Sequence, residues 1–211
     1  MATKTSLRRA PKQARGQRRI GRILEAAAAE FARVGFDAAT TNAIARRAKT
    51  SVGSLYQFFP NKAAVLAALT EHYLGEIRAV HAVVLSAEAA KLPLPAFIDQ
   101  LVERLAQFHA THPGFLGLFY GSPTSAHLAA AAERLHRECV AGAEASIAAR
   151  LPNLDPERRR LHATLNVQVV KALLPLAEAA GPAGRAQVLA EIKKLLMRYM
   201  DGVAAEGCGS S

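Results

Sequence analysis

Histidine is the residue type whose spacing in this chain comes nearest to a chemical site. His109 and His112 stand three positions apart, which places two side chains on one face of a helix, and His127 and His136 follow in the chain. A zinc site needs three or four ligands that converge on one point. The sequence contains no HExxH pair, and Pro113 directly follows His112 at an expected helix end. We therefore expect no metal site.

The nucleophilic residues give no catalytic pattern either. Ser122 lies between Gly121 and Pro123, outside the Gly-x-Ser-x-Gly frame of a nucleophile elbow. Cys139 and Cys208 are too few for a disulfide framework, which favours a reduced, cytoplasmic setting. The glycine patterns of Walker and Rossmann sites are absent. We expect a protein that is not an enzyme, with no catalytic residues and no cofactor.

A different chemistry is indicated by the stretch TSVGSLYQFFPNK, residues 50–62, where small residues stand close to bulky aromatic residues. A short helix in this stretch would have to serve two surfaces. Leu55 and Phe59 supply the bulk for a small core, whereas Gly53 and Ser54 leave room on the opposite face. Small residues permit a helix to approach the edges of bases in the major groove of DNA.

The charge distribution points to the same partner. Residues 1–62 contain 13 Lys and Arg against three acidic residues, whereas residues 63–211 contain 14 of each sign, so the whole surplus of +10 lies in the first third. Such a surplus favours a polyanion. The Tyr56 hydroxyl and the Lys62 ammonium are suited to contact DNA phosphates.

The apolar periodicity predicts a helix-turn-helix in this basic third. Residues 1–17 read as a disordered basic arm. A helical stripe follows from residue 18 and ends at Gly35, where a left-handed residue is expected. Two short helices come next, the first capped by Thr40 or Thr41 and the second by Ser51. Two short helices joined by a tight turn behind a longer one form this motif.

The apolar periodicity of the remaining chain predicts longer helices, so we expect an all-α fold with about nine helices. We expect a helix-turn-helix domain over residues 18–64, a helical effector-binding and dimerisation domain over 65–205, and a disordered tail over 206–211. The apolar runs are too short to span a bilayer, and we expect no membrane partner. The helices expected after the third span about 61–85, 95–112, 125–151, 156–180 and 183–205.

The stretch TTNAIARRAKTSVGSLYQFFPNKAAVLAAL, from Thr40 to Leu69, resembles the DNA-binding region of the TetR family of bacterial transcriptional regulators. The family pattern has a Thr-rich start, an Ile-Ala pair, Gly-Ser/Thr-Leu-Tyr-x-x-Phe and a following Lys, all of which stand here. The turn position usually held by Gly is Lys49 in this chain. A left-handed Lys costs about 1 kcal/mol more than Gly.

The resemblance implies the roles of individual residues. Thr41, Ser54, Tyr56 and Lys62 would contact phosphates, although Thr41 is also a candidate helix cap, and both roles are compatible. The residues implied to face base edges are Asn42, Val52, Gly53 and Gln57. Arg46 and Arg47 would also reach the backbone, and the basic arm would either enter a minor groove or attract phosphates diffusely.

The last two helices would form a homodimer interface, as the corresponding helices do in the family. Ordinary packing within one protomer would give the same apolar pattern. The candidate interface residues are Leu161, Leu165, Val169, Leu173, Leu176, Val188, Ile192, Leu195 and Tyr199.

Regulators of this family bind a small molecule in the C-terminal domain, and mostly apolar walls would suit an apolar or aromatic effector. For each candidate residue, simple core packing is the alternative. The candidates are Phe97, Leu101, Phe108, Phe115, Phe119, Tyr120, His127, Cys139 and Gln168.

These observations, together with the resemblance, predict a ligand-responsive transcriptional repressor that binds a pseudo-palindromic operator in double-stranded DNA as a homodimer. An activator would have the same residues. An effector-independent architectural DNA-binding dimer is the alternative, and it would bind with a steep salt dependence and little sequence preference.

Overall fold

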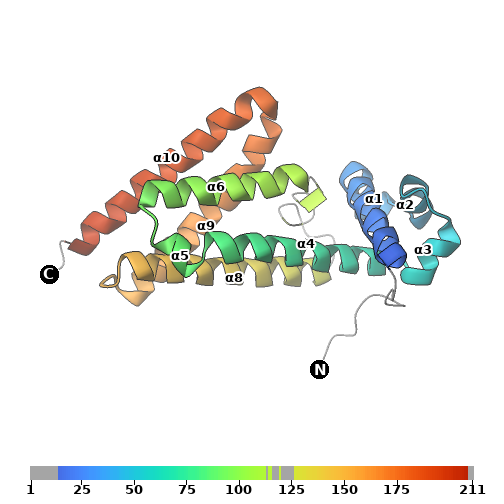
Figure 1. Ribbon diagram of the computed structural model, residues 1–211, viewed down its shortest axis with the longest axis horizontal. Coiled ribbons are helices and arrows are strands. Elements are labelled where there is room, and N and C mark those ends of the chain that lie inside the picture. Colours follow the sequence, from blue (N-terminus) through green and yellow to red (C-terminus); the bar gives the residue numbers. More distant parts are fainter. Residues whose placement is uncertain (1–13, 113, 116–118, 120–125, 209–211) are drawn as a thin grey trace. The chain divides into compact units, whose positions relative to one another are not determined.

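The computed structural model describes residues 14–112, 114, 115, 119 and 126–208 (Figure 1). The described residues form α-helices and no strand, which confirms the all-α prediction. The helices are α1 (Ala14–Ala38), α2 (Thr41–Arg47), α3 (Val52–Phe58), α4 (Lys62–Val84), α5 (Ala87–Ala90), α6 (Leu94–Thr111), α8 (Ala126–Arg150), α9 (Pro156–Ala179) and α10 (Gly181–Cys208).

The chain divides into two compact units. Unit 1 comprises residues 1–75 and 112–131, and unit 2 comprises residues 76–111 and 132–211. The long helix α4 passes from one unit into the other, because the division falls between Gly75 and Glu76. Unit 1 therefore holds α1 to α3 with the first half of α4, together with the segment around Gly114 and the start of α8.

The core of unit 1 forms where α1, α2 and α3 meet. Ile23 of α1, Ile44 of α2 and Leu55 of α3 are all fully buried, as is Phe59 directly after α3. Burial of each such side chain contributes about 1.5–3 kcal/mol relative to exposure. The predicted inner face of the third helix, with Leu55 and Phe59, is thus confirmed.

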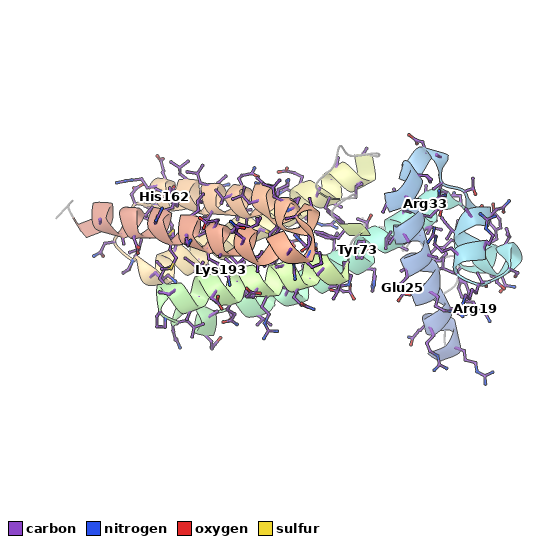
Figure 2. The ribbon with its side chains drawn as sticks, turned by 90° about the horizontal axis from the view of Figure 1, so that it is seen from above. Arg19, Glu25, Arg33, Tyr73, His162 and Lys193 are labelled. Carbon is purple, nitrogen blue, oxygen red and sulfur yellow. The ribbon has the colours of Figure 1, made fainter. Side chains whose placement is uncertain are left out.

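Unit 2 is built on a packed set of long helices. Helix α10 packs against α9 and α6, and α6 also contacts α9. One apolar cluster joins α8, α9 and α10 through Val140, Ile147, Leu154, Ala163, Met200 and Val203. His162 and Lys193, labelled in Figure 2, add polar links. His162 Nδ1 lies 2.6 Å from Tyr199 Oη, and Lys193 donates to Asp99 at 2.6 Å.

Several helix ends differ from the sequence-based expectations. Helix α1 begins at Ala14, so residues 14–17 are helical rather than part of an arm; residues 1–13 lie outside the described part of the chain. Gly35 has the expected positive φ of 78°, but its ψ of 166° produces a kink after which one more turn runs to Ala38. Helix α10 continues to Cys208, beyond the expected end near residue 205.

Candidate nucleic-acid interface

Short polar side chains cap the N-termini of the two helices that carry the candidate interface. Thr40 caps α2 by accepting a hydrogen bond from Ala43 N at 3.1 Å, so the cap is Thr40 and the Thr41 side chain is left for another role. Ser51 caps α3 by accepting from Ser54 N at 3.1 Å, as predicted. Such caps contribute about 1 kcal/mol each, which matters for helices of two turns.

The turn between α2 and α3 depends on a left-handed residue. Lys49 has φ 51° and is the only non-glycine residue with positive φ among those that the structure describes. Its amide donates to Arg46 O at 3.2 Å, and Thr50 N donates to Ala45 O at 3.0 Å. These two bonds satisfy the carbonyls at the end of α2 and reverse the chain into α3.

The surface opposite the core is polar, and we call it the α2–α3 polar face. Thr41, Val52 and Ser54 are half-buried, whereas the other members of the predicted set on these helices are exposed. Tyr56 is 41% exposed, a large value for an aromatic side chain in a small helical domain. The exposed members of this face are Asn42, Gly53, Tyr56 and Gln57.

A contact between hydroxyl groups joins the two helices of this face. Thr41 Oγ1 and Tyr56 Oη lie 3.2 Å apart, and either oxygen can be the donor. The structure therefore brings together two of the predicted phosphate ligands from α2 and α3. One hydroxyl donates to the other, and the accepting hydroxyl keeps its own O–H group. The pair can therefore donate one hydrogen bond to a phosphate oxygen while its own contact stays in place.

Lys62 has a structural role that the sequence did not indicate. Its Nζ donates to Phe36 O at 2.6 Å and to Asp37 O at 2.9 Å, and it lies 4.5 Å from the centre of the Phe36 ring. The ammonium thus caps the last turn of α1 from the first residue of α4. Two of its three N–H donors already have protein partners, which leaves one for a phosphate.

Sequence reasoning also missed a buried carboxylate on α1. Glu30 is 3% exposed, and it accepts from Arg33 Nη2 at 2.7 Å and from Arg47 Nε of α2 at 3.3 Å. The hydrogen bond from Arg33 is the largest of the influences that lower the pKa of Glu30, against the opposing effect of burial. The charge of Glu30 could be read in the sequence, but its partner Arg47 is 17 positions away and no local pattern links them.

The two arginines open onto a hollow of about 420 Å³ in the surface of unit 1. We call it the arginine hollow, and its lining residues are Glu30, Arg33, Ala43, Arg46 and Arg47. Figure 2 shows Arg33 on α1. The hollow carries three guanidinium groups against one carboxylate.

The candidate effector residues fall in both units. Phe97 and Phe108 are buried in unit 2, Leu101 and Cys139 are half-buried there, and Gln168 is exposed. Arg150 lies 4.4 Å from the centre of the Phe97 ring. Burial raises the pKa of the Cys139 thiol to about 12, so the group stays protonated.

The other effector candidates belong to residues 112–131 of unit 1. Phe115 and Phe119 are buried and stack with ring centres 4.5 Å apart. Tyr120 and the side chain of His127 lie outside the described residues. The Phe115 ring also meets the Tyr73 ring of α4 edge to face, with centres 5.7 Å apart. Among the residues that the structure describes, no group of three or more potential metal ligands is found.

The candidate dimer residues separate into two groups. Leu161, Leu165 and Leu176 of α9 and Leu195 of α10 are 42–55% exposed. Ile192, by contrast, is 1% exposed and packs within the protomer. Val169, Leu173, Val188 and Tyr199 are half-buried.

None of the described helices has the length and apolar character that a bilayer span requires.

Comparison with known proteins agrees with this geometry. Residues 23–69 match the model of bacterial regulatory proteins of the tetR family, and residues 93–200 match the model of the tetracyclin repressor-like C-terminal domain. The HTH-type transcriptional repressor SCO4008 of Streptomyces coelicolor is 31% identical over 127 residues, which cover 57% of this chain. The match spans 60% of the length of that repressor.

Solved structures show the same fold. A TetR-like transcriptional regulator from Rhodococcus sp. RHA1 aligns with a TM-score of 0.72 at 18% identity over 92% of this chain and 100% of its own. A TetR-family regulator from Streptomyces coelicolor aligns with a TM-score of 0.58 at 24% identity, over 88% and 99% of the two chains. The C-terminal match alone covers more than half of the sequence, and the N-terminal match contains α2, α3 and their turn. The chain therefore belongs to the TetR family, whose members are bacterial transcriptional regulators.

Proposed function

We propose that the protein is a homodimeric transcriptional repressor that leaves a palindromic DNA operator when it binds a small apolar or aromatic effector. The observation that carries the DNA-binding part is the α2–α3 polar face. There Thr41 and Tyr56 share a hydroxyl contact of 3.2 Å beside exposed Asn42 and Gln57. Hydroxyl groups bind phosphates, and the amide side chains of Asn and Gln can pair with adenine.

The charge of the chain supports the same partner. The surplus of +10 lies entirely within residues 1–62, which include α1, α2 and α3. A basic surface of this kind raises both the rate of association with DNA and the affinity at low salt. The similarity to a protein named as a repressor favours repression over activation.

The exposed leucines support a homodimer. Leu161, Leu165 and Leu176 repeat along one side of α9, and α9 packs on α10, which carries Leu195. Pairing of two such helix pairs would bury these side chains in a four-helix bundle. A dimer would place two copies of α3 on successive major grooves of an inverted repeat.

Release of DNA by an effector requires a route between the units. Helices α4 and α8 both run from one unit into the other, and α4 is the one that follows α3 directly in the chain. A displacement of α4 on effector binding would alter the spacing of the two α3 helices. A coupling of about 1–3 kcal/mol changes operator affinity about 5–150-fold. The buried aromatic residues Phe97 and Phe108 favour an apolar or aromatic effector.

The test is selection of bound sequences from a random duplex pool at one fixed salt concentration. Enrichment of a single inverted repeat supports a specific dimeric repressor and supplies the probe for effector screening. Binding that weakens steeply with salt and enriches no sequence would contradict the proposal and favour an architectural DNA-binding dimer.

A further inference from the structure

We propose that the arginine hollow binds a phosphate group of the DNA backbone, and that Glu30 is the residue that positions its arginines. This inference rests on the proposed DNA-binding function. The family resemblance already implies that Arg46 and Arg47 reach the DNA backbone, and what is added here is that Glu30 and Arg33 of α1 complete a site with them. Its basis is a buried carboxylate that organises two guanidinium groups at the edge of a hollow lined by a third.

The geometry at Glu30 fixes where the two guanidinium groups point. Glu30 Oε1 accepts from Arg33 Nη2 at 2.7 Å, and Oε2 accepts from Arg33 Nε at 3.4 Å, so Arg33 makes a two-pronged contact. Arg47 uses only Nε, at 3.3 Å. An arginine has five N–H donors, so Arg47 keeps both Nη groups for another partner. A guanidinium that binds a carboxylate along one edge can thus bind a phosphate along the other.

The charge of the hollow is unbalanced. Glu30 is the only acidic side chain among the described residues that line it, against Arg33, Arg46 and Arg47. No ion pair of Arg46 is found within the described part of the chain. Arg33 and Arg47 share the one carboxylate and Arg46 lines the same hollow, so the three guanidinium groups repel each other, and a bound anion would lower that repulsion.

The position of Arg46 assigns the anion to DNA. Arg46 follows Asn42 by four residues on α2, a spacing that places both side chains on one side of the helix. Asn42 belongs to the α2–α3 polar face. The hollow is therefore next to that face, one helical turn farther along α2. The side chains of Arg33 and Arg47 are 57% and 43% exposed, so a phosphate can reach them.

The experiment measures the salt dependence of binding to the inverted repeat recovered by selection, using the full chain. Each protein–phosphate contact contributes about 0.9 to the slope of log affinity against log salt. Arg46→Ala should therefore lower the slope by about 1.8 for a dimer, which corresponds to roughly 30-fold weaker binding at about 0.15 M salt. Arg104→Ala, which removes an exposed arginine of α6 in unit 2, is the matched control and should leave the slope unchanged.

The role of Glu30 is tested by a variant for which charge and geometry predict opposite results. Glu30→Gln adds one positive charge to each protomer, so charge alone predicts tighter DNA binding. Positioning predicts weaker binding, because Arg33 and Arg47 lose their shared anchor. If Glu30→Gln fails to fold, Arg47→Lys serves instead. It keeps the charge but loses the planar fork, so weaker binding is again expected.

Three outcomes would overturn the proposal. The first is a slope for Arg46→Ala equal to that of Arg104→Ala. The second is unchanged or tighter binding by Glu30→Gln and Arg47→Lys. The third is binding of inorganic pyrophosphate that Arg46→Ala abolishes while the DNA slope stays unchanged, which would assign the hollow to a free phosphate compound. Failure of the wild-type protein to select any duplex contradicts the proposed function itself, so the two failures are distinguishable.

Discussion

The ammonium group of Lys62 donates hydrogen bonds to the backbone oxygens of Phe36 at 2.6 Å and Asp37 at 2.9 Å, so the first residue of α4 caps the last turn of α1. The kink at Gly35 leaves this turn short, and a cation at a helix C-terminus also complements the helix dipole. The link joins elements that lie 26 positions apart in the chain.

Replacement of Lys62 should therefore reduce stability. We expect Lys62→Met to lower the free energy of unfolding by about 2 kcal/mol, since a hydrogen bond that involves a charged group contributes about 1.5–3 kcal/mol. Urea unfolding measures this change, with Lys91→Met as the control because Lys91 is an exposed lysine. Equal stability of the two variants would contradict the capping role. If Lys62→Met also has a lower slope of log DNA affinity against log salt, that result would support the phosphate contact that the family resemblance implies.

Gly114 should tolerate no side chain. A Cβ atom at this position would lie 2.9 Å from Ala28 Cβ and 3.3 Å from Ala28 O, both on α1. We expect Gly114→Ala to lower the free energy of unfolding by about 1–3 kcal/mol through overpacking. Gly75→Ala is the matched control, and it should change the free energy of unfolding in the opposite direction. Nothing lies within 4 Å of its Cβ, and alanine should stabilise α4 by about 0.5–1 kcal/mol. A neutral Gly114→Ala would contradict the close contact with α1.

The hydroxyl groups of Tyr56 and Tyr199 should separate DNA binding from stability. Tyr56 Oη is exposed and contacts Thr41, whereas Tyr199 Oη is half-buried and contacts His162 at 2.6 Å. We expect Tyr56→Phe to weaken DNA binding about tenfold and to change the free energy of unfolding by less than about 0.5 kcal/mol. Tyr199→Phe should leave DNA affinity unchanged and lower the free energy of unfolding by about 1–2 kcal/mol. Fluorescence anisotropy and urea unfolding measure the two effects.

One result for Tyr56→Phe would contradict this prediction. If the variant binds DNA as tightly as the wild type does, the hydroxyl pair is not part of the proposed interface.

The exposed leucines of α9 should hold the dimer together. Leu176 is 54% exposed, and its replacement by Arg places two charges in a symmetric interface. We expect Leu176→Arg to weaken dimerisation by about 2 kcal/mol or more, roughly 30-fold, as measured by sedimentation equilibrium. Val83→Arg is the control, since Val83 is 48% exposed but lies on α4. A dimer that Leu176→Arg leaves intact would show that α9 is not the interface.

His81 should make the fold less stable as the pH falls. Burial lowers the pKa of His81 to about 4, against an opposing attraction from Glu138. An unfolded histidine titrates near 6.5, so the unfolded chain binds more protons between pH 6.5 and pH 4. The free energy of unfolding should therefore decrease by up to about 3 kcal/mol across this window and be unaffected by His81 above it.

The measurement compares urea unfolding of the wild type and of His81→Gln on both sides of pH 6.5. The variant should lose less stability as the pH falls. Parallel pH profiles for the two proteins would show that His81 is not the group responsible.

Local sequence determined the helices and their caps. Ser51 caps α3 as predicted, Asn61 accepts from Ala64 N at 2.8 Å at the start of α4, and Asp155 caps α9 with Pro156 in its first turn. These features involve residues no more than three positions apart. The spacing of Leu55 and Phe59, with Gly53 and Ser54 on the other side, was also sufficient to predict a helix with one buried and one exposed face, because residues four positions apart share one side of a helix.

Only the tertiary structure decided which polar groups meet. The sequence did not indicate that Lys62 caps α1, and it assigned no role to Glu30, which binds Arg47 across 17 positions. Apolar periodicity likewise placed Ile192 in the dimer interface, whereas the fold buries it within the protomer. Periodicity shows which side of a helix is apolar, but it does not show which element covers that side. The partner of a charge or of an apolar stripe is set by contacts that are distant in the sequence.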